Sequence, residues 1–151
     1  MSLSVREARA GDLAAIVRLH EADSLGGHGD AWNEANAPLY QAAFEAIRSS
    51  PATTLYVACE EGAVVGTFQL VVAPGLTGRG SLRARLESVQ VREDRRSAGI
   101  GAAMVAFAEK EARAKGAASL ELTSNKRRVD VHRFYERLGY TRSHEGFKKR
   151  L

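Results

Sequence analysis

A glycine-bearing loop between a predicted strand and a predicted helix constrains the fold of this chain more than any other feature. The strand is expected over Leu86–Val91, and apolar residues at helical spacing start again at Ile100, directly after Gly99. The first amides of a helix have no partner inside the helix, and its dipole is positive at that end. Glycine also lets an anion approach the backbone closely. The segment therefore predicts a strand–loop–helix unit that suits a diphosphate group.

The distribution of charge supports an anionic ligand. Residues 1–75 carry four basic and nine acidic side chains, whereas residues 76–151 carry eighteen basic and nine acidic ones. Nucleic acid, anionic lipid and a phosphorylated cofactor all fit a basic half. Aromatic residues near the basic runs are scarce, which disfavours a nucleic acid as the ligand. The loop also lacks the Gly-x-Gly-x-x-Gly and Gly-Lys-Ser/Thr patterns, which disfavours nicotinamide dinucleotides and ATP hydrolysis.

Length and composition predict one domain over residues 1–151, without an internal linker. The single cysteine, Cys59, excludes a disulfide within the chain, and it lies in an apolar run with no evident activating partner. His132 and His144 have no partners at ligand spacing, so no metal is expected. No apolar run approaches the roughly 20 residues of a membrane span, and no signal peptide is recognised. A cytoplasmic protein without membrane contact is predicted.

Hydrophobic periodicity predicts an α+β fold in which helices flank a mixed central sheet. The expected order is β-α-α-β-β-β-α-β-α-β-β, with Asp12 as the N-cap of the first helix and Gly116 ending the third. The expected strands lie at residues 3–6, 55–59, 64–72, 86–91 and 119–123, and a final hairpin is expected within residues 140–151.

The hexapeptide Arg96-Ser97-Ala98-Gly99-Ile100-Gly101 matches the Arg/Gln-x-x-Gly-x-Gly/Ala signature of a known family. The strand Leu86–Val91 precedes it, and Asn125 and the run Phe134–Tyr140 follow it at the expected places. The chain thus resembles the GNAT superfamily of acyl-CoA-dependent N-acetyltransferases over nearly its whole length. Ser97 departs from the signature's frequent glycine without breaking the pattern. The resemblance implies the GNAT fold and acetyl-CoA as co-substrate.

The resemblance also assigns the residues that would bind the cofactor. The backbone of two strand residues would pair with the pantetheine arm, amides of the loop would hold the pyrophosphate, and one asparagine would contact the arm. The strand residues are Val89 and Val91, and the asparagine is Asn125. The loop amides are those of Arg96, Ser97, Ala98, Gly99, Ile100 and Gly101.

Two residues are candidates for proton transfer. Tyr135 matches the family's tyrosine near the CoA sulfur, where a phenol can protonate the departing thiolate, although an ordinary core tyrosine would give the same pattern. Glu87 matches a position that is often acidic and could bind the ammonium group or orient a water. A glutamate on the strand face, paired with Arg83 or Arg85, is the alternative.

The acceptor is the least constrained part of the prediction. The loop at residues 23–36, with His28, Asp30, Trp32 and Glu34, would border the acceptor site or be an unrelated surface loop. Residues 126–128 would meet the CoA 3′-phosphate or form a solvated basic run. The stretch 123–147 is also similar to aminoalkylphosphonate N-acetyltransferases, which favours a small-molecule amine. A protein N-terminus or lysine as acceptor, and a non-catalytic acyl-CoA-binding regulator, stay open, and the family suggests a homodimer.

Overall fold

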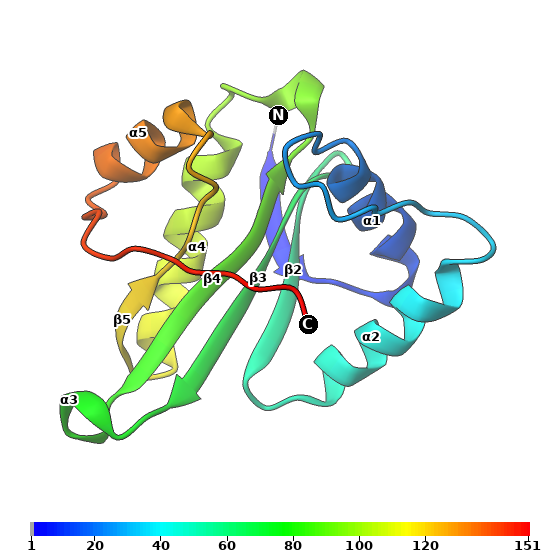
Figure 1. The fold of residues 1–151 in the computed structure, drawn as a ribbon. Coiled ribbons are helices and arrows are strands. Elements are labelled where there is room, and N and C mark those ends of the chain that lie inside the picture. Colours follow the sequence, from blue (N-terminus) through cyan, green and yellow to red (C-terminus); the bar gives the residue numbers. More distant parts are fainter. Residues whose placement is uncertain (1) are drawn as a thin grey trace. The chain divides into compact units, whose positions relative to one another are not determined.

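A five-stranded sheet organises the first part of the chain. The computed structural model describes residues 2–151, which form two units that divide between Glu121 and Leu122. In the first unit the strands follow one another across the sheet in chain order, from β1 to β5 (Figure 1). Neighbours from β1 to β4 are antiparallel, whereas β5 is parallel to β4. This mixed sheet with flanking helices confirms the predicted α+β class.

The elements agree closely with the expected order as far as the last helix. The strands are β1 Leu3–Glu7, β2 Thr53–Glu60, β3 Ala63–Pro74, β4 Leu82–Val91 and β5 Ala117–Glu121. The helices are α1 Leu13–Glu21, α2 Ala37–Ser49, α4 Ile100–Ala114 and, in the second unit, α5 Val129–Arg137. Short helical turns are η1 Ala10–Asp12, α3 Thr77–Gly80 and η2 Glu93–Arg95. Within residues 2–151, no helix has the length and apolar character that crossing a bilayer requires.

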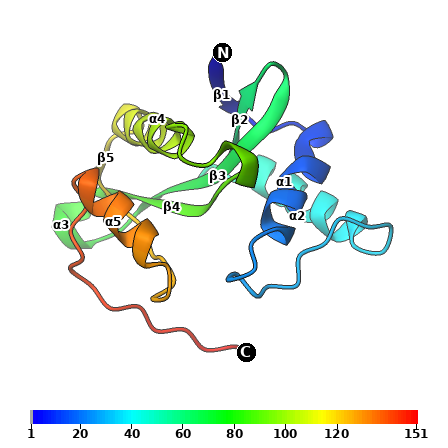
Figure 2. The same cartoon turned by 90° about the horizontal axis from the view of Figure 1, so that it is seen from above.

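Helices cover both faces of the sheet, with α4 on one side and α1 and α2 on the other (Figure 2). On the α4 face, a Cβ on Gly66 would lie 2.7 Å from the sulfur of Met104, so a larger residue there would displace the buried Met104 side chain. The rings of Phe68 and Phe107 also meet on this face, 6.4 Å apart. On the opposite face, Val57 of β2 packs against Ile16 of α1. These two apolar layers fix the sheet between its helices.

Two glycines mark the ends of α4 as predicted. Gly99 is its N-cap residue with φ +83°, and Gly116 follows its C-cap with φ +86°. Residues with a Cβ rarely adopt this left-handed backbone conformation. The helix therefore begins and ends where the sequence allows the chain to turn.

Asp12 takes the N-cap position of α1, but its carboxylate does not cap that helix. Instead, it accepts hydrogen bonds from the backbone N–H of Arg9 at 2.7 Å and from both terminal nitrogens of Arg6 at 2.8 and 3.1 Å. The hydrogen bond from Arg6 is the largest cause that lowers the pKa of Asp12 below its ordinary value. Asp12 thus ties β1 to the turn that precedes α1.

Replacing Asp12 with alanine should lower the free energy of unfolding at pH 7 by about 1–2 kcal/mol, because two hydrogen bonds from the Arg6 guanidinium and one from the Arg9 backbone are lost. Because the pKa of Asp12 is lower in the folded than in the unfolded state, its carboxylate stabilises the fold at pH values above the unfolded pKa. That stabilisation is lost as the pH falls through the folded-state pKa. The difference between the two proteins should therefore shrink below about pH 4. Urea unfolding at several pH values measures this, and a difference independent of pH would contradict the role of the charge.

The expected final hairpin is wrong, because no strand forms within residues 138–151. The segment after Tyr140 contains few apolar residues, and three of its last four are the consecutive cations Lys148–Arg150. The side chain of Phe147 is 97% exposed, so it does not anchor the segment in a core. Without an apolar alternation to bury, a hairpin gains too little to offset its loss of conformational entropy.

Candidate active site

Strand β4 leaves one edge open along its second half. Its parallel pairing with β5 covers only Leu82–Arg85, since β5 ends at Glu121. Among the described residues, Leu86, Glu87, Gln90 and Val91 have strand partners only on β3, and Ser88 and Val89 have no strand partner. The unpaired donors and acceptors of such an edge can bind an extended ligand in the manner of an added strand.

The backbone groups of Val89 and Val91 lie on this open edge. The N–H of Arg92 donates to the carbonyl of Val65 on β3 at 2.8 Å, so the backbone N–H and C=O of Arg92 point toward β3. The backbone polar groups of successive strand residues point toward opposite neighbouring strands. Those of Val91 therefore point away from β3, and so do those of Val89 two residues earlier. The side chain of Arg96 donates from Nε to the Val91 carbonyl at 3.2 Å, which agrees with this direction.

A bulge in β4 changes the side-chain pattern just before the open edge ends. Glu87 lies opposite Gln69 of β3, whereas Gln90 lies opposite Thr67. The extra residue is accommodated at Ser88, which has φ +53°. As a result, the side chains of Glu87 and Gln90 share the face of the sheet that α1 covers. Nothing in the sequence indicates this bulge, because serine is not typical of left-handed backbone.

Glu87 forms an ion pair with Arg85 on the same strand face, at 2.6 Å from Oε1 to Nε. The glutamate side chain is 34% exposed, so its carboxylate reaches solvent. Of the two arginines expected as partners, the structure thus selects Arg85. An exposed pair of this kind costs little to break, and the carboxylate can still bind an ammonium group or orient a water.

Gln90 and Asp23 form a contact that the sequence analysis missed. Nε2 of Gln90 donates to Oδ2 of Asp23 at 2.9 Å, joining β4 to the segment that follows α1. The two residues are 67 positions apart, so no local pattern could connect them. The contact brings a second carboxylate to the face of β4 that carries Glu87.

The loop after Asp23 is attached to the first turn of α2. The hydroxyl of Tyr40 donates to Asp30 at 2.7 Å, and its ring lies 6.1 Å from the ring of Trp32. His28 and Glu34 are exposed on the same loop. Burial lowers the pKa of His20 at the end of α1, against the opposing effect of Asp30 and Asp23. The loop therefore presents acidic and aromatic groups near the end of α1.

The loop Arg96–Gly101 presents backbone amides at the N-terminus of α4. Ser97 and Gly99 have φ +63° and +83°, which turns the chain tightly around this point. Apart from Gly99 itself and its neighbours along the chain, no atom lies within 4 Å of the position that a Cβ on Gly99 would take, so the backbone is open there. No side chain caps α4, and Ser97 to Gly99 are exposed while Ile100 is buried. Amides arranged in this way bind phosphate oxygens.

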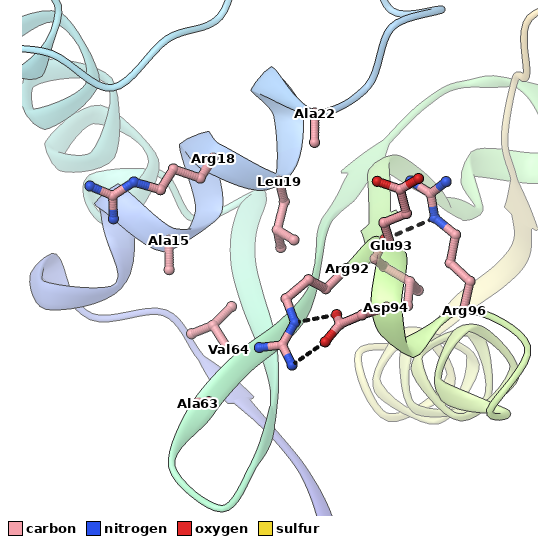
Figure 3. A pocket seen from close by; sticks show the side chains of 11 residues that line it. Ala15, Arg18, Leu19, Ala22, Ala63, Val64, Arg92, Glu93, Asp94 and Arg96 are labelled. Atoms are coloured by element: carbon pink, nitrogen blue, oxygen red, sulfur yellow. Dashed lines mark hydrogen bonds and ion pairs between the residues drawn. The ribbon is translucent and has the colours of Figure 1, made fainter.

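An open groove of about 670 Å³ lies beside this loop, on the side of α1 (Figure 3). Leu19 of α1, Ala22 just after that helix and Val64 of β3 give it apolar walls. The rim is charged, and there Arg92 donates two hydrogen bonds to Asp94 at 2.6 and 3.1 Å. A groove with apolar walls and few polar groups can hold part of a small organic molecule.

Asn125 and Tyr135 belong to the second unit. The carbonyl of Asn125 accepts a hydrogen bond from the backbone N–H of Arg128, and its side-chain oxygen accepts one from the N–H of Arg127. Tyr135 on α5 is 8% exposed, and its ring packs edge-on against Phe134 and Tyr140 at 5.0 and 5.7 Å. Burial raises the pKa of Tyr135 to about 12, which keeps its hydroxyl protonated at neutral pH.

The remaining candidates contribute less to the site. The ring of His132 is hydrogen-bonded to the carbonyl of Asn125 at 2.8 Å, as expected for a histidine with a structural partner. Lys126 and Arg127 are exposed. Cys59 is a buried free thiol. Over residues 2–151, no group of histidine, cysteine and acidic side chains has a metal-binding arrangement.

Comparison with known proteins decides the family. Residues 13–140 match the model of the Acetyltransferase (GNAT) family. The chain belongs to the GNAT acetyltransferase family. A relative, the aminoalkylphosphonate N-acetyltransferase of Salmonella typhimurium, is 34% identical over 119 residues, which cover 79% of this chain and 77% of that protein.

Solved structures show the same fold. A protein described as a transcriptional regulator from Bacillus halodurans superposes with a TM-score of 0.95 at 36% identity, covering 99% of this GNAT chain and 100% of the other. Glucosamine-6-phosphate N-acetyltransferase from Arabidopsis thaliana superposes with a TM-score of 0.82 at 19% identity, covering 99% of each chain. At that identity the second likeness speaks for the fold alone.

Proposed function

We propose that this protein transfers the acetyl group of acetyl-CoA to the primary amine of a small molecule, with both substrates bound at once. The observation that carries the proposal is the exposed amide loop Arg96–Gly101, which links the open edge of β4 to the N-terminus of α4. Membership of the GNAT family supports acetyl transfer, and the N-acetyltransferase relative supports nitrogen as the acceptor atom. No acyl-enzyme is required, because positioning two substrates side by side supplies a large share of the rate.

The residues of the loop and of β4 fit the two polar parts of coenzyme A. The amides from Arg96 to Gly101 would hold the diphosphate, and the open backbone at Gly99 leaves room for its oxygens. Val89 and Val91 would pair with the amide groups of the pantetheine arm along the free edge. For Asn125, a contact with the same arm rests on the family resemblance. When bound there, acetyl-CoA supplies a thioester carbonyl for the amine to attack.

Glu87 is proposed to help the amine lose its proton. A primary alkyl amine has a pKa near 10.4, so only about one part in 10³ is neutral at pH 7. This deficit corresponds to roughly 4 kcal/mol, which a base or a water relay must help to overcome. The carboxylate of Glu87 is exposed and lies on the same strand face as Gln90, so it can bind the ammonium or take its proton through a water.

Replacing Glu87 with glutamine should lower kcat/KM at pH 7 by about a hundredfold, because the amide cannot accept the proton. The loss should shrink toward pH 10, where the free amine becomes abundant in solution. A pH profile of acetyl transfer measures this, with Glu45→Gln on the exposed side of α2 as control. If kcat/KM of the variant had the same pH dependence as that of the unaltered protein, Glu87 would not act as the base.

Tyr135 is proposed to donate a proton to the departing sulfur. Its pKa of about 12 means that the hydroxyl carries a proton throughout the neutral range. A positioned phenol of this kind can neutralise the thiolate as the carbon–sulfur bond breaks.

The small-molecule acceptor is supported by the aminoalkylphosphonate N-acetyltransferase relative. The acidic and aromatic side chains of the 23–36 loop would suit a cationic amine. A thermal-shift assay with acetyl-CoA, followed by thiol release with a panel of amines, tests the proposal. Turnover with N-terminal or lysine peptides and not with small amines would instead favour a protein acceptor.

A second candidate function is a non-catalytic acyl-CoA-binding regulator. The observation in its favour is the likeness to the Bacillus halodurans protein described as a transcriptional regulator. Such a module would bind CoA and release no thiol with any amine, and its Tyr135 would be dispensable.

We further propose one catalytic domain over residues 1–151, which works in the cytoplasm as a homodimer. The single domain is supported by a family match that runs from residue 13 to residue 140, across both structural units. The free thiol of Cys59 suits a reducing compartment, and light scattering tests the dimer.

A further inference from the structure

An ion pair joins the segment before the amide loop to the end of strand β2. Nε and Nη2 of Arg95 donate to Oε1 and Oε2 of Glu60 at 2.7 and 2.8 Å. The side chain of Glu60 is 10% exposed and that of Arg95 is 26% exposed, so solvent reaches little of the pair. Two parallel bonds between a guanidinium and a carboxylate fix both distance and direction. Arg95 is therefore held in one orientation.

Glu60 provides a rigid support for this bond. It pairs with Leu3 of β1 on one side and with Ala63 of β3 on the other. The tight turn that follows, at Glu61 and Gly62, has φ +50° and +80°. Three paired strand ends thus fix the backbone that carries the carboxylate.

Arg95 lies directly before the amide loop, so its bond to Glu60 fixes the backbone where that loop begins. It ends the turn η2 and directly precedes Arg96, the first residue of the amide loop. At the start of this segment, the N–H of Arg92 is already bound to β3 at 2.8 Å. The bond to Glu60 therefore fixes the second end of the segment, just before the residues proposed to hold the diphosphate.

The same geometry makes Arg95 a poor direct ligand for an anion. Two of its N–H groups point at Glu60, and the carboxylate balances the charge of the guanidinium. The hydrogen bond from Arg95 is the largest cause that lowers the pKa of Glu60, so the partner stays ionised at neutral pH. An arginine paired in this way holds the backbone in place.

We infer that Glu60 and Arg95 are positioning residues, which hold the Arg96–Gly101 loop in the arrangement that binds the diphosphate of coenzyme A. The inference rests on the proposed function, because it presupposes CoA binding at that loop. It adds two residues that touch neither the cofactor nor the acceptor and that lie 35 positions apart in the sequence.

The first test is a double-mutant cycle read by calorimetry with free CoA. Glu60→Ala and Arg95→Ala should each weaken CoA binding by about tenfold, because a misplaced binding loop loses its preorganised geometry. The double variant should bind no more weakly than either single one, since both remove the same bond. If Arg95 instead contacted the anion directly, Glu60→Ala would free a cation and bind CoA as tightly as before or more tightly, which would overturn the inference.

The second test separates positioning from general stability. S-acetylpantetheine lacks the diphosphate, so Glu60→Ala should use it with the same kcat/KM as the unaltered protein while its KM for acetyl-CoA rises about tenfold. Equal losses with both donors would mean that the pair only maintains the fold, and would overturn the inference. Glu45→Ala, which removes an exposed ion pair on α2, is the matched control and should change neither value.

Two further outcomes keep the inference distinct from the proposed function. If Glu60→Ala does not fold, Glu60→Gln keeps the shape and one acceptor, and it should show the same selective loss for the full cofactor. Normal CoA binding by both Glu60 variants would overturn the inference alone. Failure of the unaltered protein to bind CoA at millimolar concentration would overturn the proposed function, and this inference with it.

Discussion

Phenylalanine in place of Tyr135 is expected to lower kcat for acetyl transfer by about ten- to a thousandfold, the usual range for loss of a general acid. The substitution removes only the hydroxyl, whose pKa of about 12 keeps it protonated in the neutral range. Since the proton is needed when the carbon–sulfur bond breaks, the affinity for CoA should hardly change. Steady-state kinetics with varied acetyl-CoA separates the two effects.

The ring contacts of Tyr135 make this substitution a clean test. Phe134 and Tyr140 meet its ring edge-on at 5.0 and 5.7 Å, and phenylalanine keeps both contacts. The melting temperature should therefore stay within a few degrees of that of the unaltered protein. Tyr140→Phe, in the same unit, is the matched control and should keep its kcat. An unchanged kcat for Tyr135→Phe would leave Tyr135 as an ordinary core residue.

The strands and helices were predictable up to Gly139 because their signals are local. Apolar residues alternate or recur at helical spacing, and Gly99, Gly116 and Gly139 all have positive φ at the ends of elements. The final hairpin failed for the opposite reason. A strand needs a partner and an apolar face, and beyond Tyr140 the sequence supplies mainly polar and charged residues.

The candidate site was predictable only where it follows a continuous motif. Arg96–Gly101, Val89 and Val91 lie in one strand–loop–helix unit, so the sequence places them together. The bulge at Ser88 left no trace in the sequence, although it decides that Gln90 shares a face with Glu87. Its left-handed backbone accompanies a shift of register against β3, which no property of serine indicates.

Contacts between segments far apart in the sequence could not be predicted, because they depend on how the fold is assembled. Glu60–Arg95 and Asp23–Gln90 join residues 35 and 67 positions apart. Each pair depends on how the strands and α1 are assembled, and charge or polarity alone does not choose among the many candidate partners. Asp12 shows the same limit at short range, since its cap position was predictable and its bonds to Arg6 and Arg9 were not.

Replacing Gly99 with aspartate is expected to weaken CoA binding by about 10²–10³-fold. The Cβ would enter the open space at this position, and it would bring a carboxylate to the amides proposed to hold the diphosphate. Two like charges about 4 Å apart near a protein surface repel by roughly 4 kcal/mol, which accounts for the size of the loss. Calorimetry with free CoA at two salt concentrations measures it, and salt should reduce the repulsion.

Strain and charge can be separated by two further variants. Gly99→Ala also forces a Cβ into left-handed backbone, at a cost of about 1–2 kcal/mol, but adds no charge, so its loss of affinity should be much smaller. Gly116→Asp places the same side chain at the other end of α4 with φ +86°, away from the amide loop. It should destabilise the fold at least as much, because a carboxylate is also unfavourable at the C-terminal end of a helix dipole, and it should leave CoA binding intact. If Gly99→Asp weakened CoA binding no more than Gly116→Asp, the diphosphate could not lie over Gly99, and another anchor for the cofactor would be needed.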